Sequence, residues 1–226
     1  MAAGAALRGE PSRQNTRRRP DRRLWRFIGA WLKIETDPEG CLSERPETAW
    51  ESVYCCRPYH ACWILGLRNP AFDKSTDGRL LDFKDGQDHA VTSETAEFSK
   101  SLSQLKLQAT VVLAMIPGHK ARHTNAGTPL ARVVENLAKR DGRFVSSFET
   151  LIRFRDIHKL ASGGDRSIAV HLNSIRVQQP ASVRGQTMIV LDDITTTGNS
   201  MDAARQLLAS AGAIRIAGIA LGRTVA

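Results

Sequence analysis

The segment that decides the fold is Met188-Ile189-Val190-Leu191-Asp192-Asp193-Ile194-Thr195-Thr196-Thr197-Gly198-Asn199-Ser200. Its first four residues are apolar, which is typical of a strand buried on both faces. Two carboxylates follow where that strand would emerge, and ligands of open α/β sheets bind at the carboxyl ends of strands. Small hydroxyl and amide residues with one glycine then lead into a predicted helix. The segment therefore predicts a strand, a ligand-binding turn and a helix of an α/β fold.

The composition of this turn suits an anion beside a polyol. Small side chains let backbone N–H groups converge on an anion, Gly198 permits close approach, and the helix N-terminus adds partial positive charge. Two adjacent acids at a strand end are costly unless they meet hydroxyls, cations or other donors. The alternative, an ordinary helix capped by Asn199 or Ser200, accounts for one polar residue and not for the rest. We interpret the segment as a sugar-phosphate site.

The residues around this segment repeat the α/β pattern. Apolar runs predict strands over 110–116, 143–148, 187–191 and 213–221, and 3–4 spacing predicts helices over 93–107, 124–140 and 200–211. Residues 80–83 are predicted as a short strand, and residues 149–180 as an irregular, charged excursion. The order implies an α/β fold with a mostly parallel twisted sheet and flanking helices, plus a small N-terminal or hood region.

The N-terminal third has a different composition. Residues 1–24 form a predicted disordered tail rich in arginine, and residues 25–79 a predicted helical and irregular region that includes a helix over 24–34. Residues 80–226 form the predicted α/β domain. No apolar run is long enough to span a membrane, and the N-terminus lacks the apolar centre of a secretory signal, so we expect a cytoplasmic protein.

The net charge of +9 is concentrated in the tail. Residues 1–26 hold eight arginines against Glu10 and Asp21, which leaves a charge of about +3 for the rest of the chain. The tail offers contacts to nucleic acid or an acidic partner, but the distribution of charge does not favour nucleic acid as the main ligand. A targeting segment and a solvated extension are the alternatives.

The four cysteines all lie in the first third of the chain. Cys55, Cys56 and Cys62, with His60 between them, are metal-competent ligand types, but two clean C-x-x-C pairs are missing. They are weak zinc candidates, and we expect no zinc. Buried packing of these side chains is the alternative.

The strand, the acid pair Asp192-Asp193 and the loop Thr196-Thr197-Gly198 resemble the signature of the type I phosphoribosyltransferases, which bind phosphoribosyl pyrophosphate (PRPP) together with Mg²⁺. The resemblance implies that Asp192 and Asp193 hold the ribose hydroxyls. It implies that the 5'-phosphate lies against the loop residues Thr195, Thr196, Thr197, Gly198, Asn199 and Ser200. Family members acting on 6-oxopurines carry an acid at the position of Thr196, so the resemblance argues against that acceptor.

Within this family the chain is most similar to the ComF-like branch associated with DNA uptake. The resemblance covers about residues 80–224 and includes the element around Lys84 and the basic excursion around Arg166 and Arg176. The four-cysteine zinc element usual in that branch has no counterpart with the right spacing here.

Two further segments have expected roles. Gly118, His119 and Lys120 follow a predicted buried strand, where backbone amides and cations would suit pyrophosphate; a solvated turn is the alternative. Arg166, between flanking glycines and polar residues, is a candidate lid residue, and an ordinary surface loop is the alternative.

The function expected from these features is phosphoribosyl transfer from PRPP to an acceptor that the sequence does not identify, with release of pyrophosphate. The electrostatic work would fall on amides and cations, and no dedicated general base or other catalytic residue stands out. The alternatives are a non-catalytic sensor of PRPP or a nucleotide, and a DNA-uptake-related protein. A homodimer is a plausible assembly.

Overall fold

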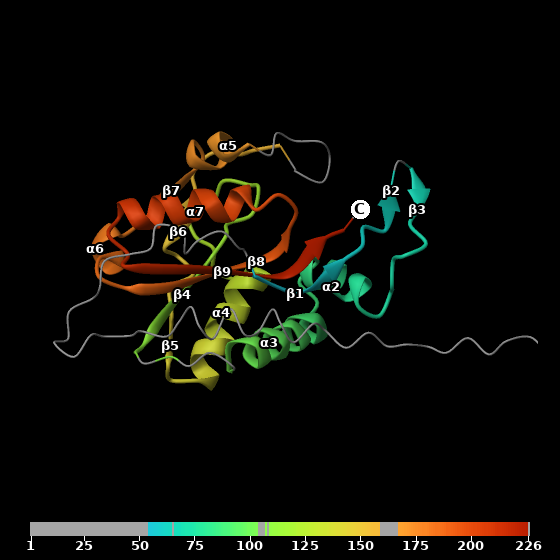
Figure 1. Ribbon diagram of the computed structural model, residues 1–226, viewed down its shortest axis with the longest axis horizontal. Coiled ribbons are helices and arrows are strands. Elements are labelled where there is room, and N and C mark those ends of the chain that lie inside the picture. The colour runs from blue at the N-terminus through green and yellow to red at the C-terminus, as the bar shows by residue number, and fades with distance from the viewer. Residues whose placement is uncertain (1–53, 65, 104–106, 108, 159–166, 226) are drawn as a thin grey trace, which may run out of the picture.

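The computed structural model describes residues 54–64, 66–103, 107, 109–158 and 167–225 (Figure 1). The predicted arginine-rich tail, the predicted helix over 24–34 and Cys41 lie outside these residues. Arg166, the candidate lid residue, also lies outside them.

The centre of the molecule is a five-stranded sheet in the order β1-β9-β8-β4-β5. All four strand pairs are parallel. The strands are β1 (Tyr54–Tyr59), β9 (Arg215–Thr224), β8 (Thr187–Thr195), β4 (Val111–Met115) and β5 (Phe144–Ser146). The predicted parallel sheet is confirmed, and β8, which carries the acid pair, is its central strand.

Helices cover both faces of this sheet, as Figure 1 shows. On one face lie α2 (Asp77–Lys84), α3 (Asp88–Ser103) and α4 (Pro129–Arg140), which bury Phe83, Phe98 and Leu137 against the strands. On the other face α7 (Asn199–Ser210) packs Met201, Ala204 and Leu208 onto the sheet. The continuous apolar runs of β4 and β8 follow from this double coverage, since both faces of each strand meet a helix layer.

Helix α4 begins later than its apolar pattern suggests. Thr128 is extended, and its hydroxyl accepts a hydrogen bond from the amide of Ala131 at 3.3 Å, while Pro129 occupies the first helical turn. A threonine cap followed by proline is a strong start signal, so residues 124–128 form a loop and not helix.

One predicted element is wrong. Residues 80–83 lie within α2 and form no strand. Leu80 and Phe83 are both buried, and their spacing of three places them on one face of a helix. Four residues are too few to separate the two periodicities, and the packing of α2 on the sheet decides between them.

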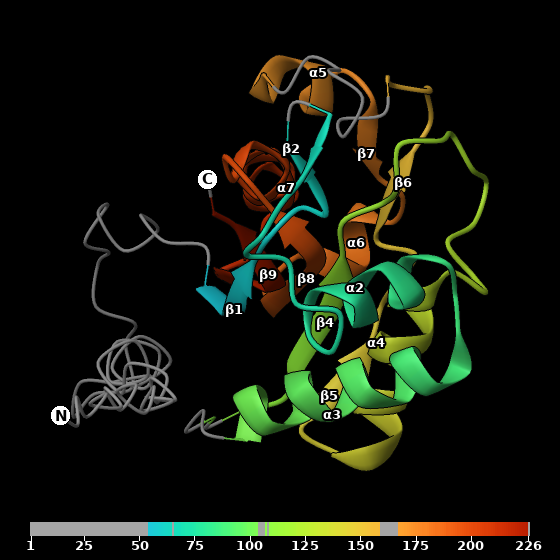
Figure 2. The same cartoon turned by 90° about the vertical axis from the view of Figure 1, so that its right-hand side faces the viewer.

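The excursion after β5 is more regular than predicted. It contains an antiparallel pair, β6 (Leu151–Arg153) with β7 (Ile175–Val177), and the short helices α5 (Ile168–Leu172) and α6 (Pro180–Val183). Leu151 and Ile175 join the apolar cluster under α7. The excursion thus leaves the sheet but packs against the α7 side of the molecule (Figure 2).

The edge strand β1 has no counterpart among the predicted elements. It pairs with β9 from Tyr54 opposite Ile219 to Tyr59 opposite Thr224, and a small hairpin, β2 (Trp63–Ile64) with β3 (Leu67–Arg68), follows it. Because β1 precedes residue 80, the sheet draws on both predicted regions, and the expected domain division stays a prediction.

A buried ionic cluster joins β1 to the helices. Glu94 of α3 is fully buried, and its Oε1 accepts hydrogen bonds from Arg57 Nη2 at 2.6 Å and from Arg79 Nε at 2.8 Å. Two guanidinium groups on one carboxylate compensate the cost of burying that charge. In the described part of the chain no helix is both long enough and apolar enough to cross a membrane.

The close approach of β1, α2 and β9 gives a test of this packing. A Cβ atom at Gly222 would lie 2.9 Å from Tyr59 Cβ and 3.1 Å from Leu80 Cδ1. We expect Gly222→Ala to lower the free energy of unfolding by about 1–3 kcal/mol, the usual cost of overpacking. Urea denaturation measures this. The control is Gly142→Ala, where a Cβ meets nothing within 4 Å; equal stability of the two variants would contradict the packing.

Candidate functional site

The acid pair lies at the carboxyl edge of the sheet. Strand β8 continues beyond its apolar part through Asp192, Asp193 and Thr195, and its pairing with β9 passes from Asp192 opposite Ala220 to Ile194 opposite Gly222. The end of β4 lies alongside, since the amide of Ile116 donates to Leu191 O at 2.9 Å. Three strand ends therefore meet where ligands of such sheets bind.

Asp192 is a buried carboxylate, 7% exposed. Its Oδ1 accepts a hydrogen bond from the amide of Asp193 at 2.8 Å, and its Oδ2 accepts one from Ser200 Oγ at 3.3 Å. Burial raises the pKa of Asp192 well above its ordinary value, and the charge of Asp193 raises it further, while the Asp193 amide and the charge of Lys84 act the other way. The site therefore holds an acid that gains from additional hydrogen-bond donors or a nearby cation.

Asp193 is the more exposed of the two acids. Its Oδ1 accepts from the amide of Ile194, and its Oδ2 lies 3.3 Å from Nζ of Lys84 at the end of α2. Each acid thus keeps one oxygen for the next backbone amide and turns the other toward a side-chain donor. Hydroxyl groups of a polyol are donors of the same kind and could replace Ser200 and Lys84.

The turn between β8 and α7 has the form expected of an anion site. Gly198 is the N-cap of α7 with a φ of +87°, a conformation that favours glycine. Thr196 and Thr197 are exposed, and the Thr196 hydroxyl lies 2.9 Å from that of Thr224 on β9. Thr195 Oγ1 is buried and has no hydrogen-bond partner among the described residues. The first backbone amides of α7 and four hydroxyl side chains therefore lie within one short turn.

The segment after β4 reaches the same edge but is already engaged. Lys120 Nζ lies 3.0 Å from Asp156 Oδ2, and Asp156 also accepts from the amide of Ala121 at 2.6 Å. The amide of Ile157 donates to His119 O at 3.0 Å. These contacts tie His119 and Lys120 to the residues after β6, which fixes this part of the loop backbone. The expected role of the loop in binding pyrophosphate stays a prediction.

Two arginines near the edge were not among the predicted site residues. Arg153, at the end of β6, is 2% exposed and donates to the carbonyls of Pro117 and Gly118. Arg223, on β9 opposite Thr195, is exposed and has no ion pair within the described residues. The run Leu221-Gly222-Arg223-Thr224 could have indicated Arg223, because polar residues there end an apolar strand; nothing in the sequence marks Arg153.

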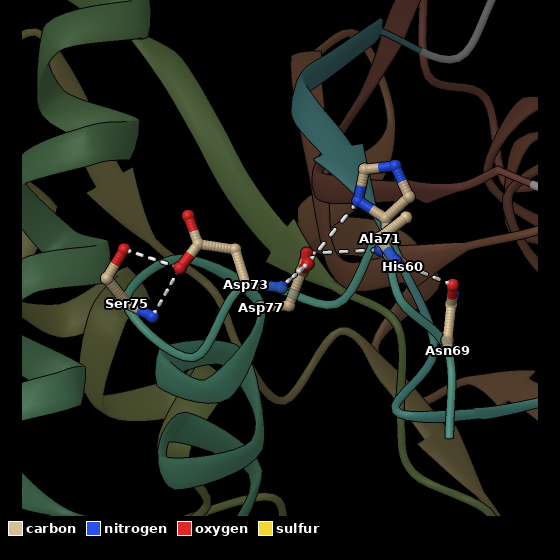
Figure 3. A network of polar contacts seen from close by, with 6 residues as sticks. All are labelled: His60, Asn69, Ala71, Asp73, Ser75 and Asp77. Carbon is tan, nitrogen blue, oxygen red and sulfur yellow. Dashed lines mark hydrogen bonds and ion pairs between the residues drawn. The ribbon is translucent and has the colours of Figure 1, made fainter. Parts of the chain in front are cut away.

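A polar network fixes the chain between β1 and α2 (Figure 3). The buried carboxylate of Asp77 accepts from the amides of His60 at 3.1 Å and Asp73 at 2.9 Å, and His60 Nδ1 lies 3.3 Å from its Oδ2. Burial raises the pKa of Tyr59, and the charges of Lys84, Asp77 and Asp193 also act on it. The end of β1 is therefore part of the surroundings of the acid pair.

Two of the weak zinc candidates, Cys55 and Cys56, pack on opposite faces of the sheet. Cys55 packs in the apolar cluster under α7, whereas Cys56 packs in the cluster on the opposite face, with its Sγ 3.4 Å from Ser101 Oγ. Burial raises the pKa of Cys55 to about 11 and that of Cys56 to about 12. Within residues 54–225, where described, no three His, Cys, Asp or Glu side chains are grouped to hold a metal ion.

Comparison with known proteins gives one family match. Residues 126–223, somewhat less than half of the chain, match the family model of the phosphoribosyl transferase domain. This match confirms the resemblance seen in the sequence, whereas the ComF-like branch stays a prediction. No curated protein matches the chain.

Among solved structures the chain is similar to a hypoxanthine phosphoribosyltransferase from Staphylococcus aureus. The likeness has a TM-score of 0.33 and 11% sequence identity, and it covers 65% of this chain and 75% of that chain.

The buried charge of Asp192 predicts a stability cost at the site. Because its pKa is raised by folding, its contribution to stability is present at low pH and is lost as pH rises through the folded pKa. We expect Asp192→Asn to raise the free energy of unfolding at neutral pH by about 1 kcal/mol, and the gain to shrink toward the ordinary carboxyl pKa. Urea denaturation at several pH values measures both.

Asp141→Asn is the matched control, and we expect it to lower the free energy of unfolding at neutral pH. Hydrogen bonds from Arg143 lower the pKa of Asp141, so its stabilisation is present at neutral pH and is lost on acidification. A destabilised Asp192→Asn protein at neutral pH would contradict the electrostatic account of the site.

Proposed function

Residues 126–223 match the phosphoribosyl transferase domain, and on that premise we propose that the chain binds PRPP with Mg²⁺ and transfers the phosphoribosyl group to an acceptor. The observation that carries the proposal is the acid pair at the end of β8, followed directly by the turn that caps α7. Acids for sugar hydroxyls and amides for a phosphate then lie next to each other, as a ribose 5-phosphate requires.

The ribose would lie against Asp192 and Asp193. Its 2'- and 3'-hydroxyls would donate to the two Oδ2 atoms that now meet Ser200 and Lys84. Hydrogen bonds from the sugar favour the ionised form of each acid and offset the burial of Asp192. A ligand without hydroxyls would leave the buried acid without this compensation, so the pair selects for a polyol.

The 5'-phosphate would lie at the start of α7. The turn from Thr195 to Ser200 contains no basic residue, and Asp192, Asp193 and Asp202 are close in sequence. Amides alone would have to hold a dianion in an acidic neighbourhood.

Arg223 offers the missing positive charge. The neighbouring residue Gly222 faces Tyr59 and Leu80 on one side of the sheet. Because successive residues of a strand point to opposite faces, Arg223 points to the other side, where α7 lies. Burial raises the pKa of Cys55 on that face, and the charge of Arg223 opposes this rise.

The pyrophosphate and its Mg²⁺ would lie between the acid pair and the loop after β4. Mg²⁺ in phosphate complexes keeps several waters and uses only one or two protein carboxylates. Asp192 and Asp193 are the carboxylates that would hold it. When bound, the ion would supply charge neutralisation at the departing pyrophosphate.

In the transfer itself, the bond from C1' of the ribose to the pyrophosphate oxygen breaks, and its electron pair leaves with pyrophosphate. An acceptor lone pair forms the new bond to C1', and the acceptor loses a proton to solvent or to a neighbouring base. The protein would act by orientation and by electrostatics: the turn and Arg223 hold the 5'-phosphate, the acid pair holds the ribose, and the loop stabilises the leaving group.

The acid pair provides the direct test of ribose binding. We expect Asp192→Asn/Asp193→Asn to lower the affinity for PRPP with Mg²⁺ by about a hundredfold, since two charge-assisted hydrogen bonds are lost. Calorimetry of the full-length chain measures this. The matched control is Asp82→Asn/Asp88→Asn, which removes two exposed carboxylates from α2 and α3.

Two results bear on the proposal in different ways. Equal affinity of the wild type and the acid-pair variant for PRPP would overturn it. PRPP binding without pyrophosphate release, across a panel of nitrogenous bases as acceptors, would favour a sensor of PRPP over a transferase.

Arg223 has a test of its own. We expect Arg223→Met to weaken the binding of ribose 5-phosphate by about tenfold, because one charge-assisted contact to the phosphate is lost. The control is Arg215→Met, at the amino end of the same strand. A similar affinity of both variants would remove Arg223 from the phosphate site.

A further inference from the structure

The guanidinium of Arg153 is buried between the loop after β4 and the excursion. Its Nε donates to Gly118 O, its Nη2 donates to Pro117 O at 3.3 Å, and its Nη1 donates to Ser174 Oγ. Ser174 follows α5 and itself donates to Val170 O at 2.6 Å. One side chain therefore joins three segments that are far apart in the sequence.

The partners of Arg153 are unusual for a buried cation. All three acceptors are uncharged, and no carboxylate in the described part of the chain comes within ion-pair distance of it. Burial lowers the pKa of Arg153 to about 10, and the charge of Asp192 is the opposing influence. The group therefore stays charged at neutral pH, and the acid whose charge acts on it is Asp192.

The contacts of Arg153 also determine the direction of the loop amides. In a trans peptide the C=O and the following N–H point to opposite sides, and no cis peptide occurs in the described residues. Because the carbonyls of Pro117 and Gly118 turn toward Arg153, the N–H groups of Gly118 and His119 point away from it. Successive amides that point to one side of a turn form an anion-binding concavity.

We propose that Arg153 is a positioning residue for the leaving group: it holds the loop 117–120 in the form that presents its amides to pyrophosphate. This inference rests on the proposed function and extends it, because it assigns the pyrophosphate half of the site to the β6–β7 excursion. The 5'-phosphate half depends on α7 and Arg223 instead. A substitution in one half of the site should therefore weaken the binding of the ligand of that half only.

The test measures the two halves of PRPP as separate ligands. The full-length wild type, Arg153→Met and Arg153→Lys are titrated by calorimetry with pyrophosphate and with ribose 5-phosphate, each with Mg²⁺. Met keeps the length of the side chain and removes every donor, whereas Lys keeps the charge and loses the planar fork. Arg155→Met is the matched control, since Arg155 is exposed two residues further on and stacks on Phe154 with its guanidinium carbon 5.3 Å from the ring centre.

We expect Arg153→Met to bind pyrophosphate at least about tenfold more weakly than the wild type and to bind ribose 5-phosphate within about twofold. The pyrophosphate affinity of Arg153→Lys should lie between those of the wild type and Arg153→Met. The affinity of Arg155→Met for each ligand should match that of the wild type. Unchanged pyrophosphate affinity in Arg153→Met overturns the inference. A wild type that binds ribose 5-phosphate but not pyrophosphate also overturns the inference.

Misfolding of Arg153→Met and a lack of binding by the wild type also have defined consequences for the inference. If Arg153→Met loses both ligands through misfolding, Arg153→Lys decides: a selective loss of pyrophosphate affinity supports the positioning role, and wild-type affinity or the loss of both ligands overturns it. A wild type that binds neither ligand contradicts the proposed function itself, which distinguishes that failure from a failure of the Arg153 inference alone.

Discussion

A carboxylate buried at the end of the central strand determines which hydrogen-bond donors lie around it at the carboxyl edge of the sheet. Asp192 is almost completely enclosed, beside a second acid, and this raises its pKa. Such a group needs donors from several directions. The chain supplies one from the next backbone amide and one from Ser200 in the first turn of α7, so the same requirement links the end of β8 to the start of the helix. The turn between them is thereby tied to the end of β8.

The sheet topology then brings charges of opposite sign to this acid. The end of β9 lies beside Thr195 and carries Arg223, and the end of β4 leads into the loop whose carbonyls Arg153 holds. These cations come from positions far apart in the sequence, and neither contacts an acid directly in an ion pair of the described structure. In our proposal a phosphorylated sugar completes the charge balance. Its two anionic ends would meet Arg223 on one side and the loop on the other.

Much of this architecture is visible in the sequence, and the reasons for the misses are physical. The strand and turn around Asp192 follow from a buried apolar run that ends in polar residues, and β4 and α7 follow from similar patterns. Strand β1 carries Arg57 and Pro58 and has no alternation, which only an edge position accommodates. Arg153 escapes notice because two of its three partners are backbone carbonyls, and any residue type supplies a carbonyl. The family match spans the central motif, while the arginines near it are identified only by the fold.

The central claim is that the segment from Asp192 to Ser200 binds a phosphoribosyl group. Hydrogen–deuterium exchange of the full-length chain, with and without saturating ribose 5-phosphate, tests it most directly. The account predicts slower exchange of the amides from Thr196 to Ser200, because the phosphate would accept their hydrogen bonds, and little change in α3 and α4 on the opposite face. Unchanged exchange in that turn under saturating ligand would contradict it.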